Sequence, residues 1–118
     1  MDALFEWLPR IGAILTLGIG AIGFFKPTML LDSLGYELKT PISRSESRAV
    51  FGGLNLGAAL AALYFDDPTV YTTLGFAWTA ATAARFVSMA ADGTGLKDSI
   101  PPIVVDGVLA LLFLSAMA

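Results

Sequence analysis

Four long apolar stretches, separated by short polar segments, fill almost the whole chain of 118 residues. Each stretch is close to the roughly 20 apolar residues that an α-helix needs to cross a bilayer. Hydrophobic residues make up 56% of the sequence and charged residues only 14%, against about 25% charged residues in soluble domains. The pattern therefore predicts an all-α protein, a four-helix transmembrane bundle that forms one domain over residues 1–118.

Proline, glycine and polar residues mark the expected ends of the four helices. Three segments interrupt the apolar pattern, namely Lys26-Pro27, Asp66-Asp67-Pro68 and Asp92-Gly93. Such residues end helices or form turns between them. The expected spans cover about 3–25, 43–65, 69–91 and 102–118.

Local signals refine the starts of two spans and add one short helix. Ser43 and Glu46 have the spacing of an N-cap and an N3 residue in a capping box, so the second span should begin there. The pair Pro101-Pro102 is expected in the first turn of the last span, where proline is tolerated. The mixed apolar and acidic segment 28–38 predicts an amphipathic helix that lies in the membrane interface.

The positions of the basic residues predict the orientation in the membrane. The connections 26–42 and 92–101, together with the start of the second span, carry Lys26, Lys39, Arg44 and Lys97. The connection between the second and third spans carries neither lysine nor arginine. By the positive-inside rule, the connections 26–42 and 92–101 should be cytoplasmic, with both termini outside.

The composition removes several classes of function. The chain contains no cysteine and no histidine, which excludes disulfides, thiolate chemistry and histidine ligation of zinc or haem. We expect no metal and no cofactor. The net charge of -3 and the absence of a basic run argue against a nucleic-acid partner.

Ionisable residues inside three of the apolar stretches are the candidate functional residues. Arg48, Arg85 and Asp106 lie in the second, third and fourth stretches, where charges are costly and often functional. At a rise of 1.5 Å per residue, each lies about 6–10 Å from the cytoplasmic end of its helix. Glu46 lies about one turn nearer to water. We therefore expect Glu46, Arg48, Arg85 and Asp106 to form one charged cluster without net charge.

Small and polar residues accompany the predicted cluster. Gly52, Gly53 and Gly57 are expected to permit close helix packing, and Gly53 and Gly57 form a GxxxG motif. This packing could serve the chain itself or, alternatively, association with a second copy. Polar residues on the helix faces of the arginines predict a cavity that is lined by Asn55, Trp78 and Thr82.

Two roles for the cluster stay open at this point. It could be a static network that fixes the helices, or its arginines could bind the head of a lipid-like molecule, since a guanidinium grips phosphate or carboxylate with two hydrogen bonds. The favoured function is a non-enzymatic accessory subunit or binder of a membrane lipid or other hydrophobic molecule, with a membrane-protein partner or a second copy beside it. The alternative is an enzyme that acts on a lipid-soluble substrate. Glu46 or Asp106 would then be the acid or base and Arg85 the electrophilic stabiliser.

The segment from Ser43 to Gly57 resembles a domain-of-unknown-function family of small four-helix bacterial membrane proteins, which is similar to the DoxX-like group. The resemblance continues at residues 84–88, at Asp92-Gly93 and at the acidic position Asp106. It implies a four-helix transmembrane bundle in the bacterial inner membrane, and it implies no activity. Some DoxX-like proteins are associated with quinone-linked sulfur oxidation, but this chain lacks the cysteine and histidine residues that would support such chemistry.

Overall fold

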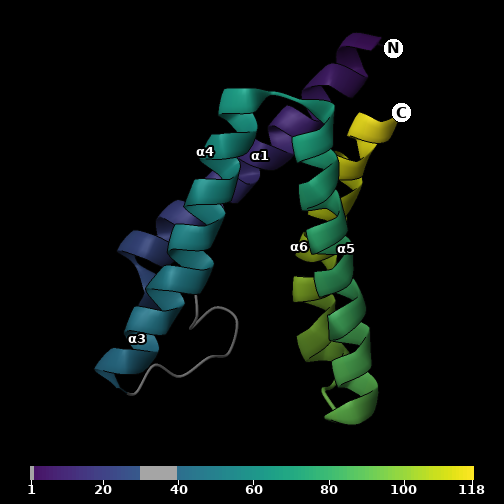
Figure 1. The fold of residues 1–118 in the computed structure, drawn as a ribbon. Coiled ribbons are helices and arrows are strands. Elements are labelled where there is room, and N and C mark those ends of the chain that lie inside the picture. Colours follow the sequence, from purple (N-terminus) through teal and green to yellow (C-terminus); the bar gives the residue numbers. More distant parts are fainter. Residues whose placement is uncertain (1, 30–39) are drawn as a thin grey trace. The chain divides into compact units, whose positions relative to one another are not determined.

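The structure is a computed structural model that describes residues 2–29 and 40–118, and the described residues form helices and no strands (Figure 1). The all-α prediction is confirmed for this part of the chain. The chain divides into two units. The α5–α6 unit comprises residues 1–12 and 66–118, and the α4 unit comprises residues 13–65. Helix α1 (Asp2–Phe25) contributes its beginning to the α5–α6 unit and the rest to the α4 unit.

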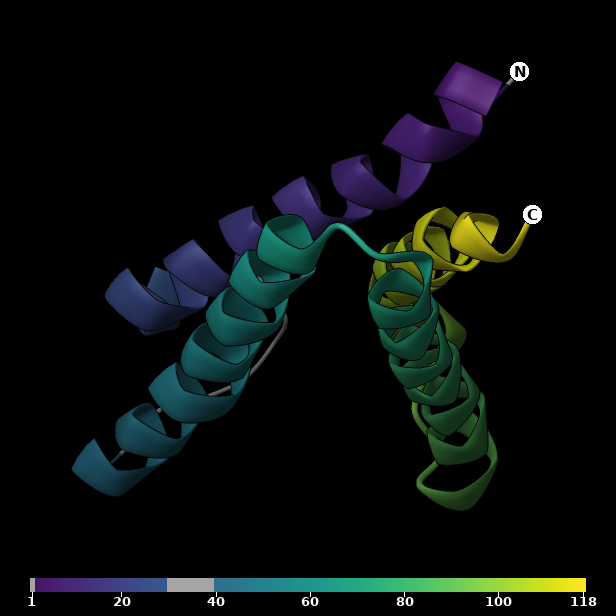
Figure 2. The same cartoon turned by 45° about the horizontal axis from the view of Figure 1, so that its top comes forward.

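Helices α5 (Pro68–Ala91) and α6 (Leu96–Leu114) lie side by side and form most of the α5–α6 unit (Figures 1 and 2). Helix α5 begins where Asp67 caps it, because the Asp67 carboxylate accepts a hydrogen bond from the Thr69 amide at 2.7 Å. It ends at Asp92, and Gly93 follows with φ at 69°. Glycine adopts this left-handed conformation without steric cost. The two turns that flank α5 thus lie where the sequence placed them.

Aromatic and small residues form the core of the α5–α6 unit. The rings of Tyr71 and Phe113 stack at 6.3 Å between centroids, and both residues are buried. Gly75 allows Leu114 to approach α5 closely, since a Cβ atom built on Gly75 would lie 2.6 Å from Leu114 Cδ2. After α6, a 3₁₀ turn (η2, Ser115–Met117) continues the chain. These contacts hold α5 and α6 together along the half of the pair that contains the end of α6.

The start of α6 differs from the prediction. The helix begins at Leu96, so Pro101 and Pro102 lie inside it rather than in its first turn. The residues before the prolines build the first turn on Gly95, whose carbonyl accepts hydrogen bonds from both the amide and the hydroxyl of Ser99. A proline lacks an amide proton and so removes one helical hydrogen bond. Pro101 and Pro102 together remove two such bonds, and the helix start at Gly95 has no side-chain cap.

A continuous helical stretch forms the larger part of the α4 unit. It consists of α3 (Pro41–Ser47), a π-helical segment η1 (Arg48–Leu54) and α4 (Asn55–Phe65). The capping box predicted at Ser43 and Glu46 is wrong. Thr40 is the N-cap, and Ser43 is the N3 residue that exchanges hydrogen bonds with it. The helix starts earlier because Pro41 follows Thr40 and has the φ angle that suits the first helical position.

Three glycines bring α1 and the second helical stretch into backbone contact. Gly20 of α1 lies against the backbone of residues 55–56, and Gly23 lies against the backbone of residues 51–52. Gly52 in turn lies against the backbone of Phe24. A Cβ atom on Gly52 would lie 2.6 Å from Phe24 Cα. Gly53 and Gly57, by contrast, make no close contact, and a Cβ atom on Gly57 would meet nothing within 4 Å. Gly52 and Gly53 are consecutive and so point to different faces of the helix. When α1 packs against the face of Gly52, the face of Gly53 and Gly57 stays out of contact with α1. Within the described residues, Gly52 packs closely against α1 and Gly53 and Gly57 do not, while association of the GxxxG pair with a second copy stays a prediction.

Three helical stretches are long and apolar enough to cross a membrane: Ala3–Phe25, Pro41–Phe65 and Leu96–Met117. Helix α5 is long enough, with 24 residues, but its threonines and Arg85 lower its hydropathy. The interfacial helix expected over 28–38 lies, beyond residue 29, outside the described residues.

Candidate functional site

Arg85 on α5 and Asp106 on α6 form an ion pair within the α5–α6 unit. Arg85 Nε donates a hydrogen bond to Asp106 Oδ2 at 3.0 Å. The Asp106 side chain is only 5% exposed, whereas that of Arg85 is 34% exposed. Because a buried carboxylate needs a partner, this pair fixes α5 and α6 against each other at one position along their length.

Arg48 and Glu46 lie in the α4 unit and have other surroundings. The Arg48 guanidinium donates a hydrogen bond to the backbone carbonyl of Phe24, in the last turn of α1. Carbonyls in the last turn lack partners within their own helix and form the negative end of its dipole, so a cation is favourable there. Glu46 is exposed and forms no ion pair with another described residue. The structure thus pairs Arg85 with Asp106, and the four-residue cluster as a whole stays a prediction.

The residues that were expected to line a common cavity use their polar groups within their own helices. The Thr82 hydroxyl donates to the Trp78 carbonyl at 2.8 Å, and the Asn55 amide donates to the Phe51 carbonyl at 2.9 Å. Asn55 belongs to the α4 unit, and Thr82 and Trp78 belong to the α5–α6 unit. Of the three residues, Thr82 lines a groove in the α5–α6 unit.

That groove runs between α5 and α6 and has a volume of about 660 Å³. Two threonines in its wall, Thr79 and Thr82, donate their hydroxyl protons to backbone carbonyls one turn earlier. This bonding satisfies their polar groups locally. The remaining wall is aliphatic or aromatic and consists of Ala83, Phe86, Ile103, Val104, Gly107, Val108, Ala110, Leu111 and Leu114. We call this surface the apolar groove.

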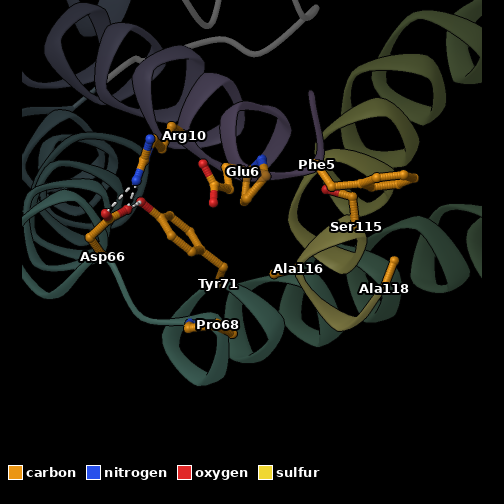
Figure 3. A pocket seen from close by; sticks show the side chains of 10 residues that line it. Phe5, Glu6, Arg10, Asp66, Pro68, Tyr71, Ser115, Ala116 and Ala118 are labelled. Atoms are coloured by element: carbon orange, nitrogen blue, oxygen red, sulfur yellow. Dashed lines mark hydrogen bonds and ion pairs between the residues drawn. The ribbon is translucent and has the colours of Figure 1, made fainter. Parts of the chain in front are cut away.

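A second cavity, of about 580 Å³, lies where the beginning of α1, the loop before α5 and the end of the chain meet (Figure 3). Its charged centre is Asp66. Arg10 binds both carboxylate oxygens of Asp66, with Nε to Oδ1 at 3.0 Å and Nη2 to Oδ2 at 2.7 Å. The Tyr71 hydroxyl donates to Oδ1 at 2.7 Å. We call this cavity the polar pocket.

A model of a domain of unknown function, DUF4345, matches residues 4–117, which is nearly the whole chain. The chain belongs to the DUF4345 family. No curated protein and no solved structure matches it. The family carries no assigned activity, so the function of this DUF4345 protein has to be argued from its two sites.

The hydrogen bonds in the polar pocket keep Asp66 ionised. The bond from Arg10, and next that from the Tyr71 hydroxyl, lower the pKa of Asp66 to about 2, although partial burial acts in the opposite direction. Asp66 also adopts a left-handed backbone conformation with φ at 47°, which aspartate tolerates better than most residues. The DUF4345 chain therefore holds a permanent negative charge in the loop before α5, and Arg10 offsets it.

Sequence reasoning missed the polar pocket in this DUF4345 chain. Arg10 lies four residues after Glu6, a spacing at which opposite charges can pair on the surface of one helix. In the structure Arg10 instead pairs with Asp66, 56 residues away. Tyr71 is buried and bonded to Asp66. One signal was available, because Arg10 is an ionisable residue inside the first apolar stretch, like the three that were singled out.

Proposed function

We propose that this protein is a non-enzymatic integral membrane protein that spans the bilayer four times. In this proposal it holds the hydrocarbon part of a lipid-like molecule in the apolar groove. The observation that carries the proposal is the groove itself, a wall without free polar groups in a chain whose helices suit a bilayer. Its volume lies within the range of about 300–1,000 Å³ that small-molecule sites occupy.

Helix α5 is the fourth span in this proposal, besides the three helical stretches that are apolar enough by themselves. Its 24 residues correspond to about 36 Å, which exceeds a hydrocarbon core of about 30 Å. Its most polar residue, Arg85, has Asp106 as a partner. Large apolar side chains on α5 are exposed, including Phe76, Phe86 and Val87. Lipid is the surrounding in which such exposure has no cost.

The orientation and the origin of the protein form part of the same proposal. Lys26, Lys39, Arg44 and Lys97 support a cytoplasmic position of the connections 26–42 and 92–101. Both termini are then outside. The resemblance to the DoxX-like group supports a bacterial inner membrane as the location.

Close packing, rather than the hydrophobic effect, has to retain a molecule in the groove. Lipid tails are as apolar as the groove, so transfer from bilayer to groove gains little solvation energy. A grooved surface instead makes more van der Waals contacts with a chain than a smooth helix pair does. The proposed ligand is therefore selected by the shape of its hydrocarbon part.

The surroundings of Asp106 support a binding function over catalysis. A general acid or base has to reach the substrate, directly or through one water molecule. The Asp106 carboxylate is buried, bonded to Arg85, and absent from the walls of both the groove and the polar pocket. Glu46 also lies outside both walls. Neither of the two carboxylates that the enzymatic alternative requires therefore lines the apolar groove or the polar pocket.

Gly107→Leu tests the proposal because it fills the groove without disturbing the helix packing. Gly107 lines the groove, and a Cβ atom there would meet nothing within 4 Å. Gly57→Leu is the matched control, since Gly57 is equally unobstructed within α4 and lines neither site. We expect wild type and Gly57→Leu, purified in mild detergent, to retain the same lipid-like molecule, and Gly107→Leu to retain at least several-fold less.

The readout is the molar ratio of extracted lipid to protein, measured by mass spectrometry. Thermal unfolding of the three proteins in the same detergent shows that both variants are folded. Equal lipid content in all three proteins, or no bound lipid in wild type, would contradict a binding role of the groove.

A further inference from the structure

The polar pocket is a second site whose chemistry differs from that of the apolar groove. We propose that it binds a primary ammonium group, with Glu6 as the counter-ion. This inference goes beyond the proposed function, because it concerns other residues, another cavity and the polar part of a ligand. It rests on the charges, the free hydrogen-bond acceptors and the walls of the pocket.

The charges of the pocket leave one carboxylate unbalanced. Asp66 and Arg10 neutralise each other through two hydrogen bonds, and Tyr71 adds a third to Asp66. Glu6 lines the same cavity but forms no hydrogen bond or ion pair with another described residue. Figure 3 shows its carboxylate on the inner side of α1, turned towards Tyr71 and Arg10. The charged side chains of the lining are two carboxylates, Glu6 and Asp66, and one guanidinium, Arg10, so acidic side chains outnumber basic ones.

Two hydroxyl oxygens line the pocket together with Glu6, besides the N–H groups of Arg10 that Asp66 does not use. The Ser115 hydroxyl donates its proton to the Leu112 carbonyl at 2.6 Å, and the Tyr71 hydroxyl donates its proton to Asp66. Both oxygens can therefore only accept a further bond, as the Glu6 carboxylate does. A primary ammonium group has three N–H donors and no acceptor, which suits a carboxylate in a lining that also offers hydroxyl oxygens.

Other ligand classes fit this pocket less well. An anion would face the carboxylates of Glu6 and Asp66, and Asp66 already offsets the positive charge of Arg10. The described residues contain no group of three acidic side chains that could hold a metal ion. A quaternary ammonium offers no donor and is usually held by a cage of several aromatic rings, whereas this lining has two rings, Phe5 and Tyr71, beside Pro9, Pro68, Ala116 and Ala118. These side chains suit the short carbon chain that carries a primary amine.

Two sources can supply this chemistry, namely the amine of a lipid headgroup and a free organic amine. Phosphatidylethanolamine in nanodiscs is the probe for the first source, with phosphatidylcholine nanodiscs as the reference. Ethanolamine added to protein in detergent is the probe for the second source, with choline as the reference. The measured quantity is the midpoint of thermal unfolding.

We expect at least one of the two amines to raise the unfolding midpoint of wild type by about 5 °C. Ethanolamine is added at ten times its Kd and compared with choline, and phosphatidylethanolamine nanodiscs are compared with phosphatidylcholine nanodiscs. Glu6→Gln should abolish this shift. Asp92→Asn, which removes an exposed charge outside both sites, should retain it. A shift with the lipid alone identifies a lipid headgroup as the ligand, and a shift with ethanolamine identifies a free amine.

Three results would overturn the proposal. They are no shift with either amine, an equal shift with choline or phosphatidylcholine, and an equal shift in Glu6→Gln. The Gly107→Leu protein separates this site from the groove, because it should keep the response to the amine while it loses groove-bound lipid. The failure of one site is thereby distinguishable from the failure of the other.

Discussion

Replacing Arg85 with leucine is expected to lower the free energy of unfolding by about 3–5 kcal/mol, because the Asp106 carboxylate would remain buried without this partner. Asp106 lies inside α6 with its side chain 5% exposed, so water cannot replace the guanidinium. Leucine keeps a large apolar side chain at the position and limits the loss of packing. The measurement is denaturant-induced unfolding in detergent micelles, followed by circular dichroism.

Two further variants separate the ion pair from other effects of the substitution. Arg44→Leu removes a guanidinium near the start of α3 and should change stability by less than about 0.5 kcal/mol. The double variant Arg85→Leu with Asp106→Leu should recover a large part of the loss, since replacing both members of a buried pair by apolar residues is often neutral. A double variant as unstable as Arg85→Leu alone would show that the unpaired carboxylate is not the cause.

Gly52→Ala is the second substitution with a large expected effect, a loss of about 3 kcal/mol. The new Cβ atom would lie 2.6 Å from both the amide nitrogen and Cα of Phe24. Backbone atoms cannot move aside as the end of a flexible side chain can, so α1 would have to separate from the π-helical segment. The same unfolding measurement applies.

Gly57→Ala is the control for Gly52→Ala, since its Cβ atom would meet nothing within 4 Å. Alanine favours a helix over glycine by about 1 kcal/mol, so this control should be unchanged or more stable. Equal stabilities of the two alanine variants would mean that α1 does not pack on Gly52.

The helices could be predicted from the sequence because their signals are local. Apolar runs gave the helices, and Asp67-Pro68 and Asp92-Gly93 gave both ends of α5 to within a residue. The starts of α3 and α6 were less accurate, since Thr40-Pro41 competed with Ser43 as a cap and a proline pair was accommodated inside a helix. Alternative N-cap residues differ by about 1 kcal/mol or less in their effect on the helix, and the residue pattern alone does not show which of them is used.

The sites were harder to predict because they depend on long-range choices. Arg85 and Asp106 were placed at similar depth by counting residues from the ends of their helices, and they do pair. Arg10 had a nearby acidic residue in Glu6, and only the arrangement of α1 against the loop before α5 selects Asp66 instead. The apolar character of the groove also depends on hydroxyl orientation, because Thr79 and Thr82 turn their protons to the backbone. No spacing rule reveals that choice.

The most direct test of the central claim asks whether α5 crosses the bilayer as the fourth span. The chain contains no cysteine, so single cysteines at Phe65→Cys and Gly95→Cys, which flank α5, can be labelled without background. The measurement is labelling of each variant in intact cells with a membrane-impermeant maleimide, compared with labelling after permeabilisation. Four spans predict that Phe65→Cys reacts in intact cells and that Gly95→Cys reacts only after permeabilisation. Reaction of both cysteines under the same condition would place the two ends of α5 on one side of the membrane and contradict the account.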